Sequence, residues 1–226
     1  MTSTTYLARR AQLETYFDRT AVQAWARLTS DAPVSGIRAT VRAGRDRMRA
    51  TLLSWLPDDL HGRRILDAGC GTGALAVVAA ERGAEVVAID LSPTLVALAR
   101  ERAPKHLPIS FRVGDMADPA LGRFDHVVGM DSLIHYRATD MARAVEGLAA
   151  RAEHSMLFTF APRTALLSVM HATGKLFPRG DRAPAIEPVS PARIGGLLAA
   201  SGLRLGRTER VSGGFYISQA LEVLPA

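Results

Sequence analysis

Apolar and polar residues follow two regular patterns over most of the chain. Short, mostly apolar runs that predict β-strands occur at residues 65–67, 84–90, 109–114, 124–130 and 154–160. Apolar residues at three- and four-residue steps predict helices at 73–82, 93–102 and 138–152. Strands that alternate with helices favour an α/β fold with a doubly wound parallel sheet, whose ligand lies at the carboxyl ends of the strands.

The first 60 residues show helical spacing without strands. Two amphipathic helices are predicted, one over residues 5–29 and one from Ile37 through Leu56, with a break at residues 31–36. We therefore predict an N-terminal helical arm or cap over residues 1–60, followed by one α/β domain over residues 61–226.

The C-terminal part adds two features to the alternating pattern. Residues 161–190 contain four prolines and two glycines. This predicts a lid insertion, because long irregular loops in compact domains are usually functional or disordered. After a predicted helix at 191–201, two apolar segments at 203–211 and 215–224 flank Ser212-Gly213-Gly214, which predicts a C-terminal antiparallel hairpin.

The composition is that of a globular domain. Hydrophobic residues make up 48% of the 226 residues and charged residues 22%, which is typical of a soluble protein. Cys70 is the only cysteine, so no intramolecular disulfide can form and a reducing compartment is favoured. Neither a signal peptide nor an apolar run of about 18 residues is visible, which predicts a cytoplasmic protein.

The most informative segment is Asp67-Ala68-Gly69-Cys70-Gly71-Thr72-Gly73, between the first predicted strand and its helix. Glycines at alternate positions let the backbone turn sharply and lie against a ligand. The free N–H groups at the start of the following helix would face that ligand. The segment therefore predicts a nucleotide-like group on this loop.

Two classes of nucleotide cofactor fit the loop. Gly69, Gly71 and Ala74, with Asp90 about 20 residues later, match the G-x-G-x-x-G/A pattern of nicotinamide and flavin enzymes. The complete motif is D-x-G-x-G-x-G, which resembles motif I of the class I S-adenosylmethionine-dependent methyltransferases. A terminal hairpin on a parallel sheet also resembles that superfamily. The resemblance implies a Rossmann-like, seven-stranded methyltransferase sheet and S-adenosyl-L-methionine as the cofactor.

The same resemblance implies which residues bind the cofactor. An acid ends each of four successive strands. In the superfamily the first acid and the glycines hold the methionine end of the cofactor, the second acid takes the ribose hydroxyls, and the third accepts from the adenine amino group. The cofactor-binding residues predicted in this way are Asp67, Gly69, Gly71, Gly73, Asp90, Leu91, Asp115, Met116 and Asp131.

Further segments narrow the resemblance to one family. The chain resembles the magnesium protoporphyrin IX methyltransferases of (bacterio)chlorophyll biosynthesis in segments 14–25, 37–45, 67–73, 131–136, 158–162 and 174–178. That family methylates one propionate of the macrocycle and makes the monomethyl ester. The resemblance also implies contact with the large subunit of magnesium chelatase and loose association with a photosynthetic membrane.

The chemistry of that reaction fits two side chains. A propionate is ionised near neutral pH, so methyl transfer to its oxygen needs no strong general base. The enzyme must strip water from the carboxylate and hold it in line with the methyl donor. His135 and Tyr16 match the proposed catalytic residues of the family, and both can orient a carboxylate by hydrogen bonding. His135 can equally act as a base or bind the magnesium of the substrate, and no metal site of the protein itself is predicted.

Positive charge is concentrated near the N-terminus. Residues 1–64 hold 11 Arg against 6 Asp and Glu, which is +5 of the formal net charge of +6. The second predicted helix carries an arginine stripe at steps of four, three and four, formed by Arg38, Arg42, Arg45 and Arg49. A solvated helix face is the simplest interpretation. The stripe also suits an anionic substrate, a partner or an acidic membrane surface.

Two other functions remain open from the sequence. A class I methyltransferase acting on another small molecule, such as a quinone precursor, would share the cofactor site and differ in the arm and the lid. A nicotinamide-binding reductase would share only the glycine loop. Nucleic acid is not an expected partner, because the positive charge is local and no target-base motif or RNA-binding module is evident.

Overall fold

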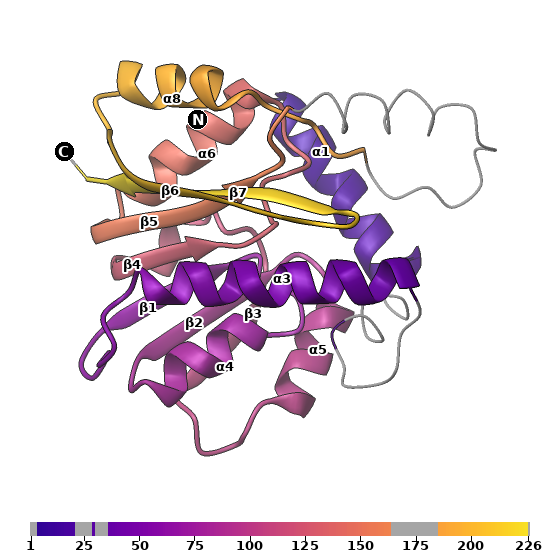
Figure 1. Cartoon of the computed structure of the whole chain (residues 1–226). Coiled ribbons are helices and arrows are strands. Elements are labelled where there is room, and N and C mark those ends of the chain that lie inside the picture. Colours follow the sequence, from indigo (N-terminus) through magenta and orange to yellow (C-terminus); the bar gives the residue numbers. More distant parts are fainter. Residues whose placement is uncertain (1–3, 21–28, 30–35, 164–184, 226) are drawn as a thin grey trace.

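Seven strands form one sheet in the order β3-β2-β1-β4-β5-β7-β6, with helices on both faces (Figure 1). The computed structural model describes residues 4–20, 29, 36–163 and 185–225. The strands are β1 (Arg64–Ala68), β2 (Glu85–Asp90), β3 (Ile109–Val113), β4 (Phe124–Gly129), β5 (Ala152–Phe160), β6 (Arg204–Gly213) and β7 (Tyr216–Leu224). The helical elements are α1 (Thr4–Thr15), η1 (Tyr16–Thr20), α3 (Gly36–Ser54), α4 (Ala74–Glu81), α5 (Pro93–Arg102), η2 (Pro119–Leu121), α6 (Ala138–Ala149) and α8 (Pro191–Ala200).

The sheet is parallel except for its C-terminal hairpin, which confirms the predicted fold. β1 pairs with β2 and β4, β2 pairs with β3, and β4 pairs with β5, all in parallel. β7 runs antiparallel to both β5 and β6 and lies between them. The turn of this hairpin is Gly214-Phe215 rather than residues 212–214, because Ser212 and Gly213 still pair with β7. Gly214 has a φ of +56°, a conformation that favours glycine.

Within the described residues, the predicted N-terminal helix changes from α-helical to π-helical geometry at Tyr16. α1 ends at Thr15 and continues as the π-helical turn η1, whereas one helix was expected over residues 5–29. The carboxylate of Asp18 accepts hydrogen bonds from the backbone N–H and the hydroxyl of Thr94 at the start of α5. These bonds attach η1 to the first turn of α5. Residues 21–28 of that prediction, with Trp25, lie outside the described residues.

The predicted lid lies mostly outside the described residues as well. Of residues 161–190, the structure describes 161–163 and 185–190. The two ends of this segment lie side by side, because Pro162 and Val189 form a parallel bridge. The backbone N–H of Glu187 also donates to the carbonyl of Ile134, after β4. The whole segment therefore leaves and rejoins the domain at the carboxyl edge of the sheet.

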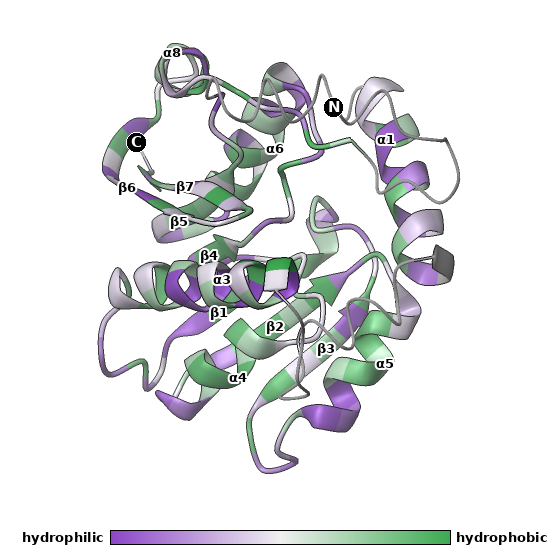
Figure 2. Ribbon diagram, turned by 45° about the vertical axis from the view of Figure 1, so that its right-hand side comes forward, coloured by the Kyte–Doolittle hydropathy of each residue, from purple (hydrophilic) through white to green (hydrophobic). Residues whose placement is uncertain are grey.

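Two hydrophobic clusters cover the two faces of the sheet. One packs α6, α8 and α1 against it, and the other packs α3 and α4. Hydrophobic residues dominate the inner strands, whereas α1 and α3 carry many hydrophilic residues (Figure 2). Met48, Leu52 and Leu53 of α3 are nevertheless buried in the second cluster. α3, which was predicted as part of a separate arm, therefore contributes to the core of the domain.

Gly44 lets α3 lie close to the hairpin. A Cβ at this position would come within 2.5 Å of the ring of Tyr216. We expect Gly44→Ala to lower the free energy of unfolding by about 1–3 kcal/mol through overpacking, although alanine is the better helix former. Gly147→Ala in α6 is the matched control, since nothing lies within 4 Å of its Cβ position. The control should gain about 0.5–1 kcal/mol in urea unfolding. Equal gains in both variants would disprove a tight contact between α3 and the hairpin.

Candidate active site

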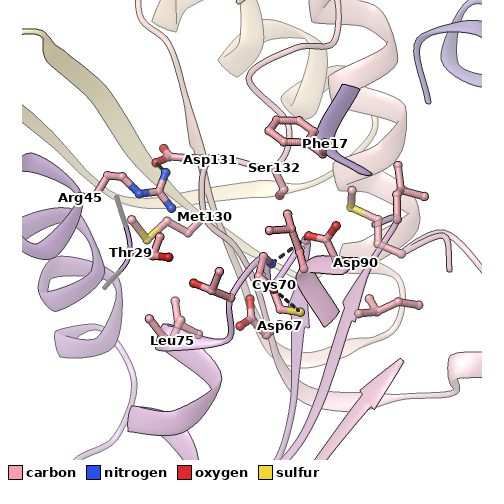
Figure 3. A pocket seen from close by; sticks show the side chains of 18 of the residues that line it. Phe17, Thr29, Arg45, Asp67, Cys70, Leu75, Asp90, Met130, Asp131 and Ser132 are labelled. Carbon is pink, nitrogen blue, oxygen red and sulfur yellow. Dashed lines mark hydrogen bonds and ion pairs between the residues drawn. The ribbon is translucent and has the colours of Figure 1, made fainter. Parts of the chain in front are cut away.

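A cavity of about 390 Å³ opens at the carboxyl edge of the sheet, where β1 lies between β2 and β4 (Figure 3). The chain crosses to opposite sides of β1 at this point, which is where ligands bind in open α/β sheets. α1, η1 and α3 supply side chains to its walls. Residues that line it include Leu13, Phe17, Arg42, Arg45, Arg49, Asp67, Gly69, Cys70, Gly71, Asp90, Leu91, Met116, Asp131, Ser132, His135 and Tyr136.

The glycine loop forms the floor of the cavity. Gly69, Gly71 and Gly73 have φ values of +86°, +53° and +79°, in the left-handed region that favours glycine. The backbone N–H groups of Gly69 and Cys70 both donate to the carbonyl of Ile89, which fixes the loop to β2. Gly69 and Gly71 line the cavity, and Gly73 is the N-cap of α4. The N–H of Gly73 donates to the carbonyl of Cys70 at 2.9 Å, but Gly73 is not among the lining residues, so its predicted contact with the cofactor stays a prediction.

Asp67 is an unusual buried acid on this floor. Asp67 is only 2% exposed, and its Oδ2 has no hydrogen-bond partner among the described residues. Burial, with Asp90 nearby, raises the pKa of Asp67 to about 7. A carboxylate oxygen that is buried without a partner costs free energy until a ligand donor binds it. A positively charged ammonium group is the donor that would compensate best.

Asp90 is held by backbone donors beside the glycine loop. Its Oδ2 accepts from the N–H of Gly71 at 2.8 Å, and its Oδ1 accepts from the N–H of Ser92 at 3.0 Å. Burial raises the pKa of Asp90, while these backbone donors oppose the rise. Asp90 and Leu91 both line the cavity, as predicted for residues that follow β2. A carboxylate with two accepting oxygens in fixed orientation suits a pair of hydroxyl groups.

Asp115 faces the N-terminal helix rather than the cavity. Its Oδ1 accepts from the hydroxyl of Tyr6 at 2.9 Å, and its Oδ2 accepts from Arg10 at 3.0 Å. The neighbouring Gly114 and Met116 line the cavity, but Asp115 is not among the lining residues described. The predicted contact of Asp115 with adenine stays a prediction, and in this structure the acid fastens α1 over the site.

His135 lies in the cavity wall, as predicted. It is 7% exposed, its Nδ1 lies 3.4 Å from the carbonyl oxygen of Ala185, and its ring faces Phe17 at 5.8 Å. Tyr16 is not among the lining residues described: its ring packs edge-on against Phe17, which does line the cavity. Tyr16 lies instead in a shallow surface depression with Ala11 and neighbouring residues. A catalytic role for Tyr16 therefore stays a prediction.

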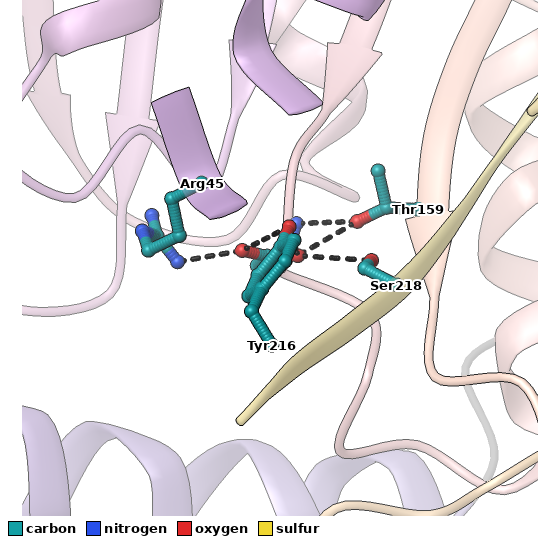
Figure 4. A network of polar contacts seen from close by, with 5 residues as sticks. Arg45, Thr159, Tyr216 and Ser218 are labelled. Atoms are coloured by element: carbon teal, nitrogen blue, oxygen red, sulfur yellow. Dashed lines mark hydrogen bonds and ion pairs between the residues drawn. The ribbon is translucent and has the colours of Figure 1, made fainter. Parts of the chain in front are cut away.

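Asp131 is the centre of a polar network at the end of β4 (Figure 4). Its carboxylate accepts from Arg45 at 2.6 Å, Tyr216 at 3.1 Å, Thr159 at 3.1 Å and Ser218 at 3.3 Å. It is the non-glycine residue with positive φ, +54°, in the part of the chain that the structure describes. Such a conformation persists only where surrounding bonds hold it. Asp131 lines the cavity, but its oxygens serve the protein's own donors, so its predicted contact with the cofactor remains a prediction.

Several cavity residues were not predicted from the sequence as site residues. Arg42, Arg45 and Arg49 belong to the arginine stripe, and their helical spacing was the available signal. Ser132 also lines the cavity, and its buried Oγ has no partner among the described residues. No sequence signal distinguished this serine from any other in a loop.

Cys70 does not offer a reactive thiol. Burial, assisted by Asp67 and Asp90, holds the pKa of the Cys70 thiol well above its usual value. The thiolate form, which is the nucleophile, is therefore disfavoured. Within the described ranges, no group of three or more His, Cys, Asp or Glu side chains is placed to hold a metal ion. The described helices also include none long and apolar enough to span a membrane.

Comparisons with known proteins agree with this geometry. Residues 129–225 match the family described as magnesium-protoporphyrin IX methyltransferase C-terminus, and residues 65–153 match a methyltransferase domain. The magnesium-protoporphyrin O-methyltransferase of Rhodobacter capsulatus is 52% identical, over 97% of this chain and 98% of that protein. Its counterpart from Synechocystis is 31% identical, over 92% of this chain and 93% of that protein.

A solved structure is similar over almost the whole chain. It is the crystal structure of magnesium protoporphyrin IX methyltransferase from Synechocystis with bound SAH, with a TM-score of 0.86 and 29% identity. The similarity covers 96% of this chain and 100% of that one. The fold and the cavity over the glycine loop thus define a class I methyltransferase with S-adenosylmethionine as its cofactor, and the nicotinamide alternative is not supported. Within this class, the two relatives described above identify the family. The chain belongs to the magnesium-protoporphyrin IX methyltransferase family.

Proposed function

We propose that this protein transfers a methyl group from S-adenosylmethionine to one propionate carboxylate of magnesium protoporphyrin IX, giving the monomethyl ester in (bacterio)chlorophyll biosynthesis. The observation that supports this most is 52% identity to a magnesium-protoporphyrin O-methyltransferase over nearly the whole length of both chains. The cavity adds physical support, because it combines an acidic floor, an apolar wall and an arginine-lined helix.

The residues present fit the cofactor. When bound, S-adenosylmethionine supplies a methyl group activated by its positively charged sulfur. The unpartnered Oδ2 of Asp67 is a suitable acceptor for the ammonium group of the methionine end. The backbone N–H groups of Gly71 and Ser92 hold the carboxylate of Asp90, which supports its role as acceptor for the ribose hydroxyls. Leu91 and Met116 supply apolar surface for the adenine ring.

The remaining work of the site is to desolvate and orient the acceptor carboxylate. Leu13 of α1 and Phe17 of η1 line the cavity with apolar surface, which would displace water from the bound acceptor and strengthen electrostatic contacts there. His135 lies in the wall on the same side and presents a ring nitrogen that can donate to a carboxylate oxygen. Since a propionate is already ionised near neutral pH, this orientation is what His135 contributes.

The direct test is an assay of product formation by chromatography. The purified protein is incubated with S-adenosylmethionine and magnesium protoporphyrin IX, and in parallel with metal-free protoporphyrin or a catechol-type quinone precursor. The proposal predicts the monomethyl ester from the magnesium porphyrin. Methylation of the quinone precursor alone would favour the other small-molecule methyltransferase considered from the sequence.

His135→Gln should impair the orientation of the acceptor carboxylate without impairing cofactor binding. We expect turnover to fall about 100-fold, within the range for a positioned hydrogen-bonding side chain. The affinity for SAH (S-adenosylhomocysteine), measured by calorimetry, should change less than twofold. His61→Gln is the control, since that imidazole is highly exposed and pairs with Asp59. Full turnover in the His135 variant would remove this side chain from the mechanism.

We also propose the family's two further contacts for this chain. These are the large subunit of magnesium chelatase and peripheral association with a photosynthetic membrane from the cytoplasmic side. The supporting observation is the surplus of arginine in residues 1–64. Co-sedimentation with anionic vesicles and pull-down with the chelatase subunit test the two contacts separately.

A further inference from the structure

The arginine stripe divides into two sets on α3. Arg42, Arg45 and Arg49 are half-buried and line the cavity, whereas Arg38 is exposed, as is Arg47, which lies on α3 outside the stripe. Positions 42, 45 and 49 fall on one face of a helix, since they are three and four residues apart. Arg47 instead donates to the carbonyl of Ser212 on the hairpin. A simple solvated face does not explain why three of the guanidinium groups meet at one cavity.

The charges of the cavity are separated in space. Asp67 and Asp90 lie on the floor, at the ends of β1 and β2. On the opposite wall α3 presents three arginines, of which Arg45 pairs with Asp131 at 2.6 Å and Arg49 with Asp46 at 2.8 Å among the described residues. The arginines of α3 thus line one side of the cavity and the two floor acids line another. This arrangement complements a ligand with separate cationic and anionic groups.

Asp131 fixes the position of this wall. The carboxylate that binds Arg45 is itself held by Tyr216 and Ser218 of β7 and by Thr159 of β5 (Figure 4). Arg45 thus starts from a defined place before any ligand enters. A guanidinium has five N–H donors in a planar fork, which matches a carboxylate better than an ammonium group does. The geometry favours recognition of a carboxylate at this wall.

We propose that Arg42, Arg45 and Arg49 form a carboxylate-binding wall, with Asp131 as the residue that positions Arg45. The inference rests on the proposed function and specifies how its ligands are held. Both ligands of the proposed reaction contain a carboxylate: the cofactor has the methionine carboxylate, and the porphyrin has its propionates. Both sources present the same group, and matched ligand pairs distinguish them.

The experiment measures equilibrium binding to Arg42→Gln, Arg45→Gln and Arg49→Gln by calorimetry and porphyrin absorbance. SAH is paired with 5′-methylthioadenosine, which lacks the amino-acid end. Magnesium protoporphyrin IX is paired with its dimethyl ester, which lacks the free carboxylates. Arg38→Gln is the matched control from the same helix.

We expect each cavity variant to lose about tenfold in affinity, or about 1.4 kcal/mol, for SAH, for the dicarboxylic porphyrin, or for both. Binding of 5′-methylthioadenosine and of the dimethyl ester should stay within twofold, and Arg38→Gln should change none of the four. A loss confined to SAH assigns the wall to the cofactor, and a loss confined to the porphyrin assigns it to the substrate.

Two results would overturn the inference. One is unchanged binding of both carboxylate ligands in all three variants. The other is an equal loss for the ligands without carboxylates, which would indicate a merely structural role. If the wild-type protein binds SAH but no magnesium porphyrin, the proposed function fails instead, and the SAH pair still tests the wall.

Discussion

Replacing Asp67 by asparagine should weaken SAH binding about 100-fold and at the same time make the unliganded protein more stable at pH 8. The affinity falls because a buried, charged hydrogen bond to the ligand is lost, a difference of about 3 kcal/mol. The stability rises because a 2% exposed carboxylate with a pKa of about 7 must be ionised at pH 8. Relieving this cost should add about 2–4 kcal/mol to the free energy of unfolding.

The same acid predicts a pH dependence of defined sign. Burial raises the folded-state pKa of Asp67 from 3.8 to about 7, so the protonated form is favoured in the unliganded fold. The stabilisation from this group is full below pH 3.8 and is lost as the pH rises through 7. A ligand ammonium favours the ionised form, so SAH binding at pH 7 should release about half a proton.

Calorimetry in buffers of different ionisation enthalpy measures that proton release, and urea unfolding at pH 8 measures the stability. Asp125→Asn is the control, because Asp125 pairs with Arg63 outside the cavity. Proton release from the Asp67→Asn variant equal to that of the wild type would assign the proton to another group. An unchanged affinity for SAH would place the ligand's ammonium group elsewhere.

Gly69→Ala should abolish measurable SAH binding and lower the free energy of unfolding by about 2–5 kcal/mol. Gly69 has a φ of +86°, and an added methyl group would overlap the Cβ of Ser132. The left-handed conformation costs about 1–2 kcal/mol for a residue with a Cβ, and the overlap adds about 1–3 kcal/mol. The loop can relieve the overlap only by moving away from its position on the cavity floor.

Gly62→Ala is the control that separates the cost of the left-handed conformation from the cost of the overlap with a neighbouring side chain. Gly62 has a similar φ of +74°, but nothing lies within 4 Å of its Cβ position. This variant should lose only about 1 kcal/mol in urea unfolding and keep its affinity for SAH. If Gly69→Ala binds SAH as tightly as the control does, the floor does not need the observed loop conformation.

The floor of the site could be predicted from the sequence because its structure is local. Alternate glycines permit a left-handed turn, and the strand before them and the helix after them have clear periodicity. Asp67 and Asp90 lie at the carboxyl ends of adjacent parallel strands, so their common edge was predictable. The parallel sheet and the terminal hairpin followed from the order of the elements.

The walls of the site depend on packing and were harder to predict. The sequence places the arginines on one side of a helix, but only the contact of α3 with β7 decides which of them meet the cavity. Tyr216 reaches Asp131 across 85 residues, and a tyrosine in a strand gives no signal of that contact. The π-helical turn at η1 changes the helical periodicity, and Phe17 rather than Tyr16 lines the cavity.

The contact between α3 and the hairpin also sets an order of events during synthesis. Arg47 and Ser212 are 165 residues apart, so α3 leaves the ribosome long before its partner strands exist. At about 5–20 residues per second, that delay is roughly 8–30 s. During this time the apolar side of α3 lacks the strand that covers it, a state prone to association with other chains. A nascent chain that stalls before β7 lacks Tyr216, and with it a donor that holds Asp131 beside Arg45.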